Sequence, residues 1–213
     1  MSLLAFFLPR FLLLRSADSR RDFFAYHVSP AFLREAIALV GDPLRKLYPD
    51  IETAIGKPLE NLTSAVADSD EKADAYIQCQ FGMNSPVVRE SSVRTAHVDK
   101  PEKIFNALLY CRATDDPTPG GDLVLYKFKR SPAFYDKRTA MPTRIDEVIS
   151  VPYESNTLVL FLNSVASVHG VRPRPPTPHI RRYINFQVEL SRKLFALPRV
   201  NPVLGYIERT LGL

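Results

Sequence analysis

Apolar residues near the start of the chain follow the spacing of an amphipathic helix. They recur every three or four positions from Phe32 to Val40, directly after Ser29 and Pro30. Serine is a good N-cap and proline is well tolerated at the first helical position, so this pair marks a helix start. We expect Gly41 to end the helix and a short second helix to follow. The pattern predicts a helical support region within residues 1–70.

From about residue 74 the pattern changes to short runs of β-branched, aromatic and aliphatic residues separated by Pro, Gly, Asp and Ser. Strands are predicted near 75–82, 92–98, 105–112, 122–129, 146–151, 157–162, 166–171 and 181–190. Short strands after a helical lead-in indicate a mainly β, α+β fold, an antiparallel sandwich or barrel with helices packed on one sheet. We interpret residues 1–213 as a single domain.

The composition narrows the class of protein. With 213 residues, 46% of them hydrophobic, the chain is not a disordered one. Cys79 and Cys111 lie in apolar runs and predict buried free thiols, which favours a cytoplasmic location. The net charge of +5 favours anionic ligands. The apolar N-terminal run, interrupted by Pro9 and Arg10, is too short to span a bilayer. We expect it to be a packing or edge segment, with a membrane contact or a cleaved signal as alternatives.

Two histidines and an aspartate are the main candidates for chemistry. His97 and Asp99 are separated by one residue, so on a strand both side chains point to the same face. His169 follows a later apolar segment and is a candidate third ligand. Two imidazoles and one carboxylate on one face of an octahedron form the donor set of non-haem Fe(II). Taken singly, each residue is more commonly an ordinary hydrogen-bonded side chain.

The last predicted strand alternates between an apolar and a polar face. Arg182 shares the apolar face with Ile184 and Phe186, whereas Arg181 lies on the polar face with Tyr183. We therefore expect Arg182 to point inward and Arg181 outward. A buried guanidinium needs an anion, and its planar fork suits a carboxylate. That carboxylate is either an internal Asp or Glu or the far end of a dicarboxylate cofactor.

Together these residues resemble the Fe(II)- and 2-oxoglutarate-dependent dioxygenases, in particular the prolyl-4-hydroxylase-like branch. The similarity covers roughly residues 76–190. It lies in the order of four features, which are His97-Val98-Asp99, Gly120-Gly121-Asp122-Leu123, His169 and Arg182-Tyr183.

The resemblance implies a fold, an activity and a set of roles. The fold is a double-stranded β-helix, or jelly roll, over residues 75–190. The activity is hydroxylation of a substrate by O2, with conversion of 2-oxoglutarate to succinate and CO2 and with ascorbate as a supporting reductant. His97, Asp99 and His169 are the implied iron ligands, and Arg182 is the implied ligand of the 2-oxoglutarate C5 carboxylate. Tyr110 is a second candidate for that carboxylate.

Some assignments stay open at this point. The loop 172–178 lengthens the gap between His169 and Arg182, which leaves Arg181 as the alternative cofactor ligand. Arg172 and Arg174 in this loop are expected either to be solvated or to contact an anionic substrate.

The substrate is an amino acid, a protein side chain or a small metabolite. Candidate contacts on the strands around His97 are Gln78, Gln80, Asn84, Arg89, Arg94 and Asn106. An oxidative nucleic-acid demethylase is the alternative enzyme, although Val188 stands where those relatives carry a second arginine. A non-enzymatic jelly-roll ligand-binding module is the alternative outside the enzymes.

Overall fold

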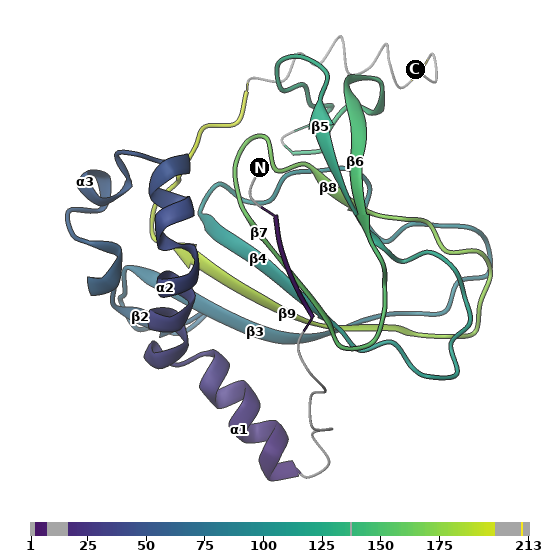
Figure 1. Cartoon of the computed structure of the whole chain (residues 1–213), viewed down its shortest axis with the longest axis horizontal. Helices are drawn as coiled ribbons and strands as arrows, with labels where there is room; N and C mark the ends of the chain where they lie inside the picture. Colours follow the sequence, from purple (N-terminus) through teal and green to yellow (C-terminus); the bar gives the residue numbers. More distant parts are fainter. Residues whose placement is uncertain (1–2, 8–16, 137, 199–209, 211–213) are drawn as a thin grey trace.

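The strands form two β-sheets in the computed structural model, which describes residues 3–7, 17–136, 138–198 and 210 (Figure 1). The larger sheet has the order β1-β7-β4-β9-β3-β2. Its strands are β1 (Leu3–Phe7), β2 (Ser64–Val66), β3 (Ala75–Asn84), β4 (Lys103–Tyr110), β7 (Thr157–Leu162) and β9 (Arg181–Leu190). All neighbours are antiparallel except the parallel pair β2 and β3. The smaller sheet has the order β6-β5-β8, with β5 (Leu123–Phe128), β6 (Ile145–Val151) and β8 (His169–Val171).

The helices lie between β1 and β2 in the sequence, apart from one short turn between β5 and β6. They are α1 (Ala17–His27), α2 (Pro30–Leu47), α3 (Ile51–Ile55), and the 3-10 turns η1 (Leu59–Asn61) and η2 (Pro142–Arg144). The Ser29 hydroxyl accepts a hydrogen bond from the backbone N–H of Phe32, as an N-cap does. The predicted break at Gly41 is wrong, because α2 continues through Gly41 and Pro43. Its inner face is buried, and this packing outweighs the poor helix propensity of Gly and Pro.

The two faces of the larger sheet have different neighbours. One face packs against the helices, through an apolar core that combines α2 with the alternate residues Phe105, Ile184 and Phe186 (Figure 1). The opposite face turns toward the smaller sheet, where Phe161 of β7 packs with Leu125 of β5. A strand covered on both sides in this way presents alternate residues to two separate environments.

The predicted mainly β fold with helices packed on one sheet is confirmed. Strands β7 and β9 have the predicted bounds. The predicted strand 92–98 is wrong. This segment makes only isolated bridges, because its one bridging residue, His97, pairs with both Thr139 and His169 instead of following one neighbour. The predicted strand 166–171 is reduced to β8, because a turn between Ser164 and Ser167 precedes it.

The N-terminal edge segment is confirmed for Leu3–Phe7, which pairs with β7 at the edge of the larger sheet. The rest of the apolar run, residues 8–14, lies outside the described residues. No helix in the described ranges combines the length and the apolar character that crossing a membrane requires. Cys79 and Cys111 are free thiols, both partly buried.

Candidate metal centre

A cavity of about 590 Å³ lies between the two sheets, on the side of the larger sheet that faces away from the helices. Its walls include polar side chains from three neighbouring strands of the larger sheet, namely Gln78, Asn106, Asn185 and Gln187. Gln187 donates a hydrogen bond to Gln78 across the β3–β9 pair, with an N···O distance of 2.7 Å. Polar groups that are this well enclosed belong to a binding site more commonly than to a packed core.

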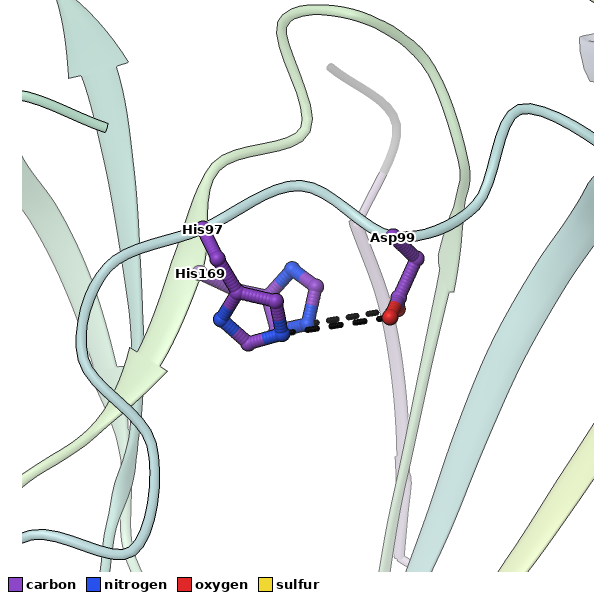
Figure 2. A group of neighbouring side chains, drawn as sticks. All are labelled: His97, Asp99 and His169. Atoms are coloured by element: carbon purple, nitrogen blue, oxygen red, sulfur yellow. Dashed lines mark ion pairs between the residues drawn. The ribbon is translucent and has the colours of Figure 1, made fainter. Parts of the chain in front are cut away.

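His97, Asp99 and His169 converge on this cavity (Figure 2). One ligand atom from each residue lies within 4.8 Å of the other two. The His169 Nε2 atom is 3.4 Å from one oxygen of Asp99, and the His97 Nε2 atom is 3.8 Å from the other. All three residues are buried. The three side chains therefore converge in the structure, as predicted.

The backbone fixes the spacing of the two imidazoles. The N–H of His97 donates to the carbonyl of His169 at 2.8 Å, and the N–H of His169 donates back to His97 at 2.9 Å. The rings lie with their centroids 4.3 Å apart, and the Phe161 ring packs on the other side of His169 at 4.6 Å. Residues that exchange both backbone hydrogen bonds are directly opposite each other, so two ligands 72 positions apart become neighbours.

Each imidazole is oriented by a hydrogen bond from its Nδ1. The Nδ1 of His97 lies 2.8 Å from the carbonyl of Thr95, and the Nδ1 of His169 lies 3.0 Å from the carbonyl of Ser167. A carbonyl oxygen only accepts, so Nδ1 carries a proton and Nε2 is the ring nitrogen directed toward Asp99. Burial, together with the nearby His169, lowers the pKa of His97 to about 3. His97 is therefore neutral at physiological pH, as a metal ligand must be.

The carboxylate of Asp99 is positioned by a buried polar pair that sequence reasoning missed. Asn106 donates its amide N–H to Asp99 at 2.7 Å, and Lys103 donates to the amide oxygen of Asn106 at 3.1 Å. The Lys103 ammonium is also 3.5 Å from Asp99. Burial acts to raise the pKa of Asp99, but His169 and Lys103 outweigh it and hold that pKa below its usual range. The available signal was the polar Asn106 within the apolar run of residues 104–110, and sequence reasoning assigned Asn106 to substrate contact instead.

The predicted orientation of the two arginines is wrong. Arg181 is 3% exposed and lines the cavity, whereas Arg182 is not among the lining residues. The apolar side of β9, from Ile184 onward, packs under the helices, so the polar side of the strand is the one that faces the cavity. The apolar residues of β9 correctly indicated a buried face. That face packs against the helices, and the opposite, polar face lines the cavity.

Arg181 lines the cavity and has no acidic partner among the described residues. Its Nε donates to the carbonyl of Gly121 at 2.9 Å, and its Nη1 contacts Asn84 at 3.3 Å. Three tyrosine rings surround the guanidinium at 5.0–5.1 Å, those of Tyr110, Tyr153 and Tyr183. No ion pair joins Arg181 to an acid within the described residues, and its Nη2 is buried without a hydrogen-bond partner.

Tyr110 supplies a second unused polar atom beside Arg181. Its hydroxyl is buried and has no hydrogen-bond partner in the part of the chain that the structure describes. Burial raises the pKa of Tyr110 to about 12, so the phenol keeps its proton and can donate it in a hydrogen bond. A cationic N–H and a neutral O–H, both buried and both unpaired, form an incomplete site that an anion would complete.

The glycine pair before β5 makes room for Arg181. Gly120 and Gly121 have φ values of 80° and 82°, a region that favours glycine. A Cβ on Gly120 would collide with the carbonyl of Pro173, and a Cβ on Gly121 would crowd the side chain of Arg181. The pair therefore lets the backbone approach closely enough for Gly121 to accept the Arg181 hydrogen bond.

The expectation of a solvated or substrate-contacting side chain is wrong for Arg174, whereas the side chain of Arg172 is partly exposed. Arg174 is buried and bonds Asp116 through Nη2 at 2.8 and 3.0 Å, and Arg172 pairs with Glu147 at 2.5 Å. Neither lines the cavity of the metal centre. Of the candidate substrate contacts, those that line the cavity are Gln78, Asn84, Arg94 and Asn106, whereas Gln80 and Arg89 do not.

Neither a family model nor a curated protein matches the chain. The structure is similar to a prolyl-4-hydroxylase of Pseudomonas putida, with 18% identity, 55% of this chain and 52% of that chain covered, and a TM-score of 0.31. It is also similar to a prolyl 4-hydroxylase of Phytophthora capsici, with 18% identity, 84% and 55% covered, and a TM-score of 0.37. The chain spans about half the length of these two proteins. Both belong to the class that the sequence motifs resemble, but similarity of this extent defines neither the fold nor the activity of the chain.

Proposed function

We propose that the chain is an Fe(II)- and 2-oxoglutarate-dependent dioxygenase that hydroxylates an amino acid, a protein side chain or a small metabolite. The observation that carries the proposal is the pairing of two incomplete sites in one cavity. His97, Asp99 and His169 form a three-atom metal donor set. Arg181 lines the same cavity, and Tyr110, whose ring lies beside the Arg181 guanidinium, is the second buried donor that has no partner among the described residues.

The donor chemistry fits Fe(II). Two neutral imidazoles and one carboxylate on the same side of an ion leave further coordination positions open. The carboxylate is already ionised and the Nε2 atoms of both imidazoles are directed toward it, so the three donors are grouped as a divalent cation requires. Co(II), Ni(II), Mn(II) and Zn(II) suit the same donors, so the metal present after purification does not identify the physiological one.

The anion site fits the distal carboxylate of 2-oxoglutarate. Arg181, rather than the initially assigned Arg182, would donate to it through Nη2, and Tyr110 through its hydroxyl. The three tyrosine rings around the guanidinium exclude water, which strengthens these hydrogen bonds. When bound, Fe(II) and 2-oxoglutarate supply the oxidising power that inserts one oxygen atom of O2 into a C–H bond, with release of succinate and CO2.

The protein's own contribution is orientation and enclosure. The paired backbone hydrogen bonds of His97 and His169 set the positions of two ligands, and Asn106 sets the third by holding Asp99. The two sheets enclose the site, and we propose that they are the halves of a jelly roll over residues 75–190. In this interpretation the helices support the larger sheet from outside, within a single domain of residues 1–213.

Succinate formation tests the proposal. Wild-type protein is incubated with Fe(II), ascorbate and 2-oxoglutarate, and succinate is measured without any added substrate. We expect slow uncoupled turnover that is lost in His169→Ala and Asp99→Ala. His179→Ala is the matched control, because His179 does not line the cavity.

A second measurement does not depend on turnover. Co(II) titration followed by visible absorption reports binding at the triad, and it should fail in His169→Ala but not in His179→Ala. Turnover and Co(II) binding that both survive in His169→Ala and Asp99→Ala would show that the metal lies elsewhere and would overturn the proposal.

A further inference from the structure

Two arginines beside the metal ligands are not used by the proposed reaction. Arg94 and Arg138 both line the cavity that contains His97, Asp99 and His169. Arg94 is exposed and Arg138 is half-buried, so both lie toward the open side of the cavity. In the described ranges neither side chain forms an ion pair.

The backbone anchors both arginines to the segments that carry the ligands. The carbonyl of Arg94 accepts from the N–H of Val171 at 2.9 Å, two residues beyond His169. The carbonyl of Arg138 accepts from the N–H of Val98 at 3.0 Å, between the first two ligands. The backbone of each arginine is therefore fixed next to the candidate metal centre. Arg94 is paired with the segment that follows His169, and Arg138 with the segment between His97 and Asp99.

The other cations of the cavity wall have partners of their own. Lys100 pairs with Glu189 at 3.6 Å, and Lys103 pairs with Asp99 at 3.5 Å. Arg181 belongs to the anion site at the end of the cavity. Among the described residues of the cavity wall, Arg94 and Arg138 are thus the cations without a partner.

Acidic residues nearby form no ion pair with either arginine in the part of the chain that the structure describes. Asp136 lies two positions before Arg138, but its oxygens accept from the backbone N–H groups of Arg138 and Thr139 and from the Thr139 hydroxyl. Asp68 also lines the cavity and has no ion pair in the described part of the chain. It is carried by the turn after β2, at the edge of the larger sheet.

We propose that Arg94 and Arg138 form the anion subsite of the substrate, which is therefore a small molecule with a carboxylate or phosphate group. This inference rests on the proposed function and names the substrate class for the same cavity. A guanidinium fork binds either oxyanion through two parallel N–H donors. An anion held there leaves the remainder of the substrate next to the metal ligands, where a C–H bond has to lie for hydroxylation.

Binding of matched probes tests the subsite without catalysis. Protein loaded with Mn(II) and the unreactive analogue N-oxalylglycine is titrated with N-acetyl amino acids and with their primary amides, and with sugar phosphates and the parent sugars. We expect at least one acid to bind about tenfold or more tightly than its neutral counterpart, the size of one charge-assisted hydrogen bond. The carboxylate and phosphate arms distinguish the two sources of negative charge.

Charge-neutral variants locate the effect. Arg94→Gln and Arg138→Gln should each weaken binding of the preferred acid by about tenfold and leave the neutral counterpart unchanged. Arg89→Gln removes the same charge from an exposed position outside the cavity and should bind the acid as the wild type does. Equal weakening in Arg89→Gln would mean a general charge effect and would overturn the subsite.

Two other results would also overturn it. One is a probe set in which no acid is preferred over its neutral counterpart. The other is tighter binding of a single-stranded oligonucleotide than of every small acid, which would favour a nucleic-acid substrate. Uncoupled succinate formation by the wild type is measured in parallel. Its presence with no acid preference refutes the subsite alone, whereas its absence refutes the proposed function.

Discussion

Replacing Arg181 by methionine, with Arg182→Met as the control, tests whether 2-oxoglutarate binds to the cavity face of β9 and not to its helix face. Arg181 is buried in the cavity wall, its Nη2 without a hydrogen-bond partner in the described ranges, and Arg182 lies outside the cavity on the same strand. The two substitutions remove the same charge from adjacent positions. We expect Arg181→Met to lose affinity for 2-oxoglutarate and Arg182→Met to keep it.

The magnitude follows from the unpaired donor. One charge-assisted hydrogen bond contributes about 2 kcal/mol, so the loss of the Nη2 donor weakens binding about thirtyfold. At a 2-oxoglutarate concentration of about one hundred times the wild-type Kd, the ligand stabilises the wild type by about 2.7 kcal/mol. The same concentration stabilises Arg181→Met by only about 0.9 kcal/mol. For a chain of this length the rise in Tm falls from roughly 8 °C to roughly 3 °C.

Thermal unfolding with and without 2-oxoglutarate, in the presence of Mn(II), measures this difference. Each protein is its own reference, so the loss of the Arg181 hydrogen bond to Gly121 does not enter the comparison. A full ligand-induced shift in Arg181→Met, together with a reduced shift in Arg182→Met, would refute the assignment of the cavity face.

Three further substitutions test the supports of the site and of the fold. Asn106→Ala removes the amide that holds Asp99 and should weaken Co(II) binding by about 10–100-fold, as titration would show; an unchanged Kd would contradict its positioning role. Asp116→Asn leaves the buried Arg174 without its counter-ion and should cost about 3–5 kcal/mol in urea unfolding, and a loss below about 1 kcal/mol would refute this. Hydrogen bonds from a threonine hydroxyl and a lysine ammonium lower the pKa of Asp74 to about 2. Its ionised form therefore stabilises the fold above its ordinary pKa, and that stability, at most about 2 kcal/mol, is lost as the pH falls from about 4 to 2. Unfolding curves of Asp74→Asn should lack this acid-dependent part.

Local patterns were sufficient for much of the fold. Short runs of β-branched, aromatic and aliphatic residues placed β7 and β9 at their observed bounds, and the spacing of apolar residues located α2. Convergence of His97, Asp99 and His169 also followed from sequence order, because the resemblance supplied the topology that brings them together. The local pattern of apolar and polar residues does not specify which distant segments of the chain lie side by side.

The arginine assignment failed for a physical reason. Alternation separates the two faces of a strand but does not say what covers each face. On β9 the helices bury the apolar face and the cavity encloses the polar face, so both are interior. The support of Asp99 by Asn106 was equally inaccessible, since a side-chain hydrogen bond between two segments depends on how those segments pack.

The mutual hydrogen bonds of the His97 and His169 backbones affect how a metal ion binds at the centre. Two of the three donors are arranged by main-chain pairing, so little conformational freedom remains to be lost when an ion arrives. Metal should therefore bind to a preorganised site, without folding of the chain around the ion. Chelators such as EDTA should strip the centre and leave the circular dichroism spectrum of the protein unchanged.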